Sequence, residues 1–276
     1  SAVLMITIYT ITGSAVYAAE IPVSDQDQLI TSRDWTEISN LQDEMKKEEP
    51  DATIDYDKAL KVYVDCNLIK LQTADTKKLT SALESANYVW VIPFKMEKTY
   101  GMFTVAKGLP LSEEAKSVLT KAEQEEVKNH AGKWMITETA EHTVEPYYDI
   151  LLEKREALSD CTRVVLVGSQ PGMRQPVALG MDDETARIWI SLGYQYPVME
   201  KIPETQNVES GVYSFDSVAE ISDTYIEDSE VSTGAGVQSR SSMKYVAGIG
   251  IIVIGSILIL SVLKKKKLEQ SGDMSR

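Results

Sequence analysis

Tyr88–Phe94 (YVWVIPF) and Tyr100–Ala106 (YGMFTVA), with the polar connection Lys95–Thr99 (KMEKT) between them, form the stretch that decides the fold. Both runs are rich in aromatic and β-branched residues, which favour strands. Two such runs joined by a short polar segment predict a β-hairpin. Pro93 has no backbone N–H to donate, so it predicts that the first strand lies at a sheet edge or contains a bulge.

The rest of residues 20–203 alternates helical patterns with strand-forming runs. Trp35, Ile38, Leu41 and Met45 recur three to four positions apart, as on one face of a helix that packs on the core. Because helices alternate with hairpins rather than with single strands, we predict an α+β fold with a mainly antiparallel sheet covered by helices. Further strands are predicted at Lys58–Asp65, Lys133–Thr139, Thr162–Val167, Gln175–Met181 and Thr185–Leu192, and further helices at Asp75–Ala86, Ser112–Asn129 and Pro146–Leu158.

Three tryptophans, Trp90, Trp134 and Trp189, fall within the predicted strands. They alternate with Val and Ile, which favours core positions. Exposed rings of this kind would instead stack on carbohydrate or peptide.

A transmembrane helix is predicted at 244–263. Tyr245–Leu263 carries no charge and would be about 28 Å long as a helix, close to the ~30 Å hydrocarbon core of a bilayer. Lys264–Lys267 follow at once, and such a cluster marks the cytoplasmic side. We therefore expect a single-pass protein of the cell membrane, anchored in the lipid bilayer, with its N-terminal domain outside and a basic cytoplasmic tail at 264–276. Val231–Gly234 resembles the threonine-glycine end of a sortase signal, but the leucine-proline half is missing, so the helix is expected to stay in the membrane.

Residues 1–19 are predicted to be a secretory signal peptide. Ala2–Ile11 is apolar, and Val16, Tyr17 and Ala18 form a small-x-small cleavage pattern. The basic start of such a peptide is missing and the chain begins at Ser1, which suggests truncation at its start. The alternative is an uncleaved N-terminal span, for which the apolar stretch is short.

The segment 204–243 is acidic and rich in Ser, Thr and Gly, which predicts a flexible stalk. The alternative within it is a short docked strand at Val212, Tyr213 and Phe215. The whole chain has a net charge of −14, and the tail carries five basic and two acidic residues, so the remainder has −17. Nucleic-acid phosphates would be repelled by this charge, so nucleic acid is not expected as a partner.

The chain has two cysteines, Cys66 and Cys161, too few for a disulfide-dense scaffold. They either form one bridge or remain two half-buried free thiols. No asparagine has a Ser or Thr two positions later, so the N-glycosylation signal is missing. Together these features favour a bacterial surface protein.

No metal, cofactor-binding or catalytic residues are predicted. His130, Glu141, His142 and Glu145 match no ligand spacing, so we interpret the histidines as structural or surface residues. Gly168–Gly172 (GSQPG) lacks both the Gly-x-Ser order of a nucleophile elbow and the Gly-Lys-Ser/Thr ending of a phosphate loop. Proline followed by glycine instead predicts a β-turn.

Adjacent acidic residues occur at Asp182–Glu184, Glu113–Glu114 and Glu125–Glu126. A glycosidase needs two carboxylates facing each other across a cleft, which adjacency in the sequence does not establish. Asp182–Glu184 could bind calcium, but the alternating pattern of an EF-hand loop is missing. Most such residues are expected to be solvated.

These features predict a surface protein that binds or scaffolds an extracellular protein or glycan rather than an enzyme. The alternative is a membrane-anchored extracytoplasmic hydrolase that uses dispersed carboxylates. Converging, desolvated acids in a cleft would favour the hydrolase.

Overall fold

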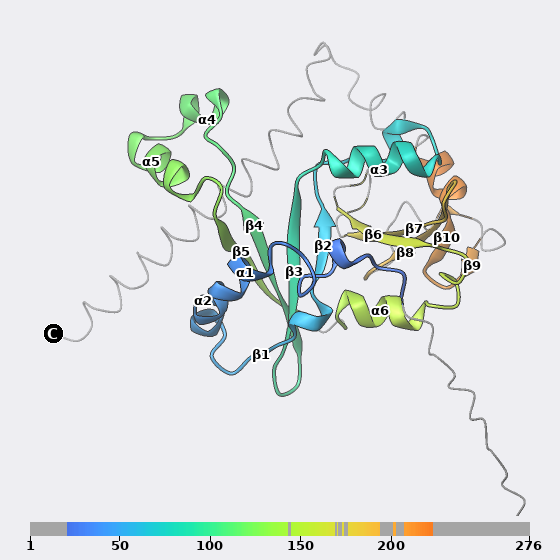
Figure 1. Cartoon of the computed structure of the whole chain (residues 1–276), viewed down its shortest axis with the longest axis horizontal. Helices are drawn as coiled ribbons and strands as arrows, with labels where there is room; N and C mark the ends of the chain where they lie inside the picture. Colours follow the sequence, from blue (N-terminus) through green and yellow to red (C-terminus); the bar gives the residue numbers. More distant parts are fainter. Residues whose placement is uncertain are drawn as a thin grey trace, which may run out of the picture.

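The computed structural model describes residues 21–222, except 143–144, 169, 171–172, 174–175, 194–200 and 203–206. It is an α+β fold with one mostly antiparallel sheet and a few helices, which confirms the predicted fold class (Figure 1). Within these residues, no helix combines the length and the apolar character that crossing a bilayer requires. The predicted signal peptide, the transmembrane helix, the cytoplasmic tail and the stalk beyond residue 222 lie outside the described part of the chain.

The sheet has the strand order β5-β4-β3-β2-β6-β7-β8-β10-β9, with β1 also paired to β3. Its strands are β1 (Thr53–Ile54), β2 (Leu60–Tyr63), β3 (Tyr88–Lys95), β4 (Tyr100–Lys107), β5 (Trp134–His142), β6 (Arg163–Val167), β7 (Val177–Met181), β8 (Ala186–Ser191), β9 (Asn207–Glu209) and β10 (Val212–Ser214). The α-helices are α1 (Trp35–Ile38), α2 (Gln42–Glu48), α3 (Thr76–Glu84), α4 (Glu113–Val118), α5 (Lys121–His130) and α6 (Tyr147–Glu153). Short 3₁₀ turns lie at η1 (Asp25–Asp27), η2 (Ser39–Leu41), η3 (Tyr56–Lys58) and η4 (Ile69–Leu71).

Two antiparallel halves meet at the parallel pair β2 and β6. The predicted hairpin is confirmed, with β3 and β4 paired from Val89 opposite Ala106 to Lys95 opposite Tyr100. Pro93, however, lies in an interior strand. Beside β3, the partner changes from β2, which ends its pairing at Val91, to β1, which begins at Phe94. A missing N–H is tolerated at Pro93 because the ladder is interrupted there.

Alternation along the strands divides the core between the two faces of the sheet. On β6, Val165 and Val167 belong to a cluster beneath α3, whereas Val164 and Leu166 belong to a cluster with Leu151 of α6. Figure 1 shows α3 and α6 on opposite faces of the sheet. A third cluster joins α1 and α2 to β3 and β4. It contains Leu29, Ile38, Met45, Ala52, Ala59, Trp90, Ile92, Phe94, Phe103, Val105 and Trp134.

The predicted burial of the tryptophans is confirmed, because Trp90 and Trp189 are fully buried and Trp134 is 6 % exposed. Two predicted helices are shorter or divided. The helix expected over Ser112–Asn129 breaks into α4 and α5, because Thr120 caps a new helix through a reciprocal hydrogen bond with Glu123. The helix expected over Pro146–Leu158 ends at Glu153.

The prediction that the stalk begins at residue 204 is wrong. Strands β9 and β10 and a helix at 215–222 continue the fold, and β10 pairs with β8 through Tyr213 opposite Trp189. Tyr213, Phe215 and Val218 are buried in the cluster beneath α3. The segment is mostly polar, and its few apolar residues become buried only when β10 pairs with β8. Its composition alone therefore predicted a stalk.

Cys66 and Cys161 are free and buried, so the structure supports the alternative of two separate thiols. Cys66 belongs to the cluster beneath α3 and Cys161 to the cluster with Leu151, on the other face of the sheet. A disulfide requires two side chains that point toward each other, which side chains buried on opposite faces of one sheet do not do without rearrangement.

Candidate functional site

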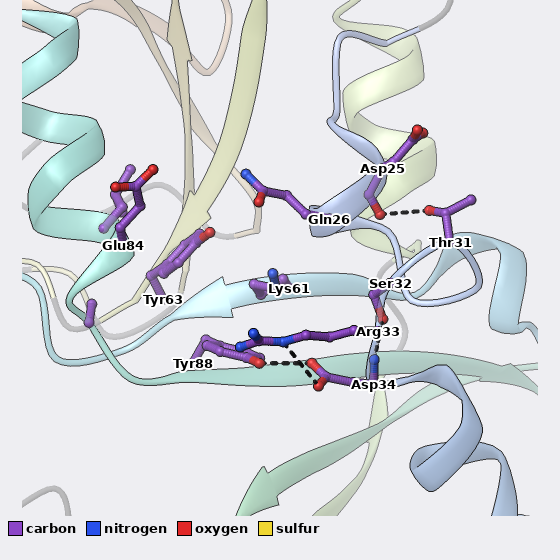
Figure 2. A pocket seen from close by; sticks show the side chains of 12 residues that line it. Asp25, Gln26, Thr31, Ser32, Arg33, Asp34, Lys61, Tyr63, Glu84 and Tyr88 are labelled. Atoms are coloured by element: carbon purple, nitrogen blue, oxygen red, sulfur yellow. Dashed lines mark hydrogen bonds and ion pairs between the residues drawn. The ribbon is translucent and has the colours of Figure 1, made fainter.

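A cavity of about 400 Å³ lies over β2 and the start of β3 (Figure 2). Most of its lining residues have polar or charged side chains, and they come from the N-terminal segment, from β2 and β3, and from the end of α3. The lining residues are Asp25, Gln26, Thr31, Ser32, Arg33, Asp34, Lys61, Tyr63, Leu83, Glu84, Ala86 and Tyr88. The size is within the range of about 300–1,000 Å³ that is usual for small-molecule sites.

Lys61 and Tyr63 of β2 form the floor of this cavity, because alternate residues of a strand point to the same face. Leu60 and Val62 point into the cluster with Leu151, so Lys61 and Tyr63 point to the opposite face. There Tyr63 belongs to the cluster beneath α3, and the ammonium of Lys61 lies over the rings of Tyr63 and of Trp90, which belongs to the cluster of α1 and α2. Tyr88 packs against both of these clusters. The cavity therefore lies between the two helical layers that cover this face.

The N-terminal segment covers the other side of the cavity. Gln28 forms an antiparallel bridge with Leu60, and the Leu29 N–H donates to the carbonyl oxygen of Ala59. Thr31 Oγ1 donates to the carbonyl oxygen of Asp25 at 2.6 Å and so closes the loop that precedes α1. These contacts bring Asp27 and Asp34 close to β2 and β3, although the two aspartates are far from these strands in the sequence.

Lys61 is the central group of the site, since its side chain is only 10 % exposed and lines the cavity. Its ammonium nitrogen lies 4.7 Å from the ring centre of Tyr88, 5.3 Å from that of Trp90 and 5.8 Å from that of Tyr63. A cation at these distances is attracted to the ring faces. Desolvation nevertheless dominates and lowers the pKa of Lys61 from its ordinary value.

Asp27 is the buried counter-charge to Lys61, with Oδ1 3.5 Å from the ammonium nitrogen. The carboxylate is 2 % exposed. It also accepts hydrogen bonds from Ser24 Oγ at 2.6 Å, from the Tyr63 hydroxyl at 2.9 Å and from Arg163 Nη2 at 3.1 Å. Donors from the protein itself therefore occupy both oxygens of Asp27. Its carboxylate and the burial around it both raise the pKa of Tyr63, with burial the larger cause.

Asp34 is a second buried carboxylate, at the wall of the cavity. Its Oδ2 accepts hydrogen bonds from the Tyr88 hydroxyl at 2.8 Å and from Trp90 Nε1 at 3.0 Å. Arg33 forms a long ion pair with it, with 3.9 Å between Nε and Oδ1. The Arg33 side chain is 86 % exposed, and Figure 2 shows it extending from the N-terminal segment toward Tyr88. The guanidinium therefore retains donors for a ligand.

The residues singled out from the sequence lie elsewhere. His130 ends α5, the backbone of Glu141 and His142 ends β5, and Glu145 precedes α6. The part of the chain that the structure describes contains no group of three or more His, Cys, Asp or Glu side chains that could hold a metal ion.

The acidic run at Asp182–Glu184 forms the turn between β7 and β8. Asp182 Oδ1 accepts from the backbone N–H groups of Glu184 and Thr185, and Oδ2 pairs with Arg187 Nε at 2.6 Å. The hydrogen bond from the Thr185 N–H is the largest cause that lowers the pKa of Asp182. This carboxylate is thus used by its own turn.

Three of the five residues in the predicted turn Gly168–Gly172 lie outside the described part of the chain. Gln170 is described and is 3 % exposed. Its amide nitrogen donates to the carbonyl oxygens of Cys66 and Gly168, and its Oε1 accepts from the Leu68 N–H. The buried amide is satisfied by the backbone, so its role is to join two loops.

Sequence reasoning missed the site at Lys61. The signal was present, since a lysine stands in the middle of a strand between Leu60 and Val62 and shares a face with Tyr63. A lysine on a strand is usually solvated, however, and the pattern does not reveal that Asp27 and Asp34 fold over it. The sequence and the structure were compared with protein-family models, curated proteins and solved structures, and none of them matches.

Proposed function

We propose that this protein is a single-pass surface protein whose folded domain binds a small ligand in the cavity over Lys61. The observation that carries the proposal is a lysine ammonium, nine-tenths buried, on the floor of a cavity of about 400 Å³. Convergent polar groups in a cavity, together with a lysine whose pKa is shifted, are features of a candidate binding site. The uncharged segment and lysine cluster near the C-terminus support the membrane anchor.

The alternative of a carboxylate hydrolase has less support. Such an enzyme needs one carboxyl that holds a proton and another that is free to act as base or nucleophile. The two buried carboxylates at this site, Asp27 and Asp34, each accept hydrogen bonds from several donors. Their arrangement favours binding and structural roles.

Native mass spectrometry of the full chain, extracted from its own membranes, tests the binding. We expect a bound small molecule on the wild type and its loss from Lys61→Met, which removes the charge and keeps an unbranched side chain of similar length. Lys70→Met, at an exposed lysine on η4, is the matched control and should retain the ligand. An empty wild-type protein that also shows no thermal shift with any member of a polar metabolite panel would refute the proposal.

The orientation is tested separately on intact cells. External protease should digest the domain at 20–222 and leave the C-terminal tail protected. Protection of the domain would contradict the surface location but would not affect the binding result.

A further inference from the structure

Resting on the proposed function, we propose that the ligand is a zwitterion of the amino-acid or short-peptide class, with its carboxylate bound by Lys61 and Arg33 and its ammonium bound by Glu84. All three side chains line the same cavity. Figure 2 shows Lys61 on the floor, Arg33 reaching in from the N-terminal segment and Glu84 at the end of α3.

The anionic group of the ligand follows from unused donors at Lys61 and Arg33. A lysine ammonium has three N–H donors. Among the described residues, the carboxylate oxygen paired with Lys61 is Asp27 Oδ1 at 3.5 Å, longer than a good hydrogen bond. The three aromatic rings around the ammonium accept no conventional hydrogen bond. Arg33 is 86 % exposed, and it interacts with the Tyr88 side chain and, at 3.9 Å, with Asp34. Because a guanidinium has five N–H donors, its fork can also receive a carboxylate.

The cationic group of the ligand follows from Glu84. Its side chain is exposed and forms no hydrogen bond or ion pair among the described residues. It is the last residue of α3, a helix of nine residues whose C-terminal carbonyl groups carry partial negative charge. Both contributions favour an ammonium group at this end of the cavity.

Ligands of a single charge fit less well. A simple anion such as phosphate would meet Asp25 and Glu84 at the rim and the net charge of −17 outside the tail. A simple cation would be repelled by Lys61 and Arg33. The aromatic rings of Tyr63, Tyr88 and Trp90 would otherwise attract a cationic ligand, but they already surround the Lys61 ammonium. A zwitterion has no net charge and matches both ends.

The test uses alanyl-alanine and its blocked forms, titrated by calorimetry into the full chain in detergent micelles. We expect the free dipeptide to bind, and N-acetylation or C-amidation each to weaken binding about tenfold or more, as loss of one charge-assisted contact does. Arg33→Gln should weaken the free and N-acetylated forms but not the amide. Glu84→Gln should weaken the free and amidated forms but not the N-acetylated one.

Matched controls are Arg155→Gln and Glu44→Gln, which change exposed charges away from the cavity and should leave all affinities unchanged. If the N-acetylated form binds as tightly as the free dipeptide, the ligand is a simple anion and the role of Glu84 is refuted. If no dipeptide form binds while a molecule found by native mass spectrometry is lost in Lys61→Met, the zwitterion inference fails and the proposed function stands. If nothing binds in either experiment, both fail.

Discussion

The ammonium of Lys61 and the carboxylate of Asp27 lie 3.5 Å apart, both almost excluded from solvent, and join the N-terminal segment to the centre of the sheet. Asp27 also pairs with Arg163 of β6, the strand parallel to β2. One carboxylate thus pairs with cations from the two strands at which the two halves of the sheet meet.

Asp27→Asn should therefore destabilise the fold by about 3–5 kcal/mol, the usual cost of removing one partner from a buried ion pair. The substitution leaves Lys61 and Arg163 without their counter-charge, and the amide cannot accept from all the donors around it. Denaturant unfolding measures the loss. Asp25→Asn, two positions earlier and exposed, is the control and should change stability by no more than about 0.5 kcal/mol. Equal effects of the two substitutions would contradict this account of the site.

Lys61→Met should change the pH dependence of stability. Desolvation lowers the pKa of Lys61 in the folded state below its ordinary value of 10.5. Between that lowered pKa and 10.5 the unfolded chain binds more protons, so this group makes the wild type gain stability as pH rises. Below both pKa values the two states are equally protonated and the cost of burying the charge is present in full.

The stability of the wild type relative to Lys61→Met should consequently increase as pH rises toward 10.5. Unfolding of both proteins at several pH values between 7 and 10 measures this difference, in which titrations shared by the two chains cancel. Lys70→Met removes a positive charge at an exposed position and is the matched control. A flat difference for Lys61→Met would mean that its ammonium is not desolvated.

A chain that ends at residue 222 should fold, whereas one that ends at residue 203 should not. The shorter chain lacks β9, β10 and the helix at 215–222, and so loses Tyr213 and Phe215 from the cluster beneath α3. Each large aromatic lost from a core costs about 3–5 kcal/mol, and two of them approach the whole stability of a typical domain. Circular dichroism and thermal unfolding of the two truncated domains distinguish the outcomes. In the full chain, Phe215→Ala should cost about 3 kcal/mol.

Both cysteines should resist thiol reagents in the folded protein. Burial is the larger cause that raises the pKa of Cys66 and that of Cys161 to about 11 each, so little reactive thiolate exists near neutral pH. Both thiols should react once the chain is unfolded, and mild oxidation should not join them. Their contribution to stability is present below about pH 9 and declines as pH rises toward about 11. Rapid labelling of the native protein at pH 8 would show that the sites are open.

Local sequence patterns predicted much of the fold. The hairpin of β3 and β4, the burial of Trp90 and Trp189 and the helix around Leu79 and Leu83 all follow from periodicities of two or of three to four residues. These periodicities reflect which face of an element meets apolar surroundings, and that property is present in a short window of sequence. The sequence did not predict the division of the Ser112–Asn129 helix. Thr120 lies within a long helical pattern and is as good an N-cap as Ser112.

The sequence by itself determined that this chain has a mainly antiparallel sheet with tryptophans in its core, because alternation and residue type are local properties. Only the tertiary structure decided that Lys61 is buried beside Asp27, that β9 and β10 complete the sheet and that Cys66 and Cys161 lie on opposite faces. Each of these depends on which distant segments lie together, and hence on the parallel pairing of β2 with β6 and on the N-terminal segment covering Lys61. Contacts of that kind depend on how the whole core packs together. They therefore cannot be inferred from any short segment of the sequence.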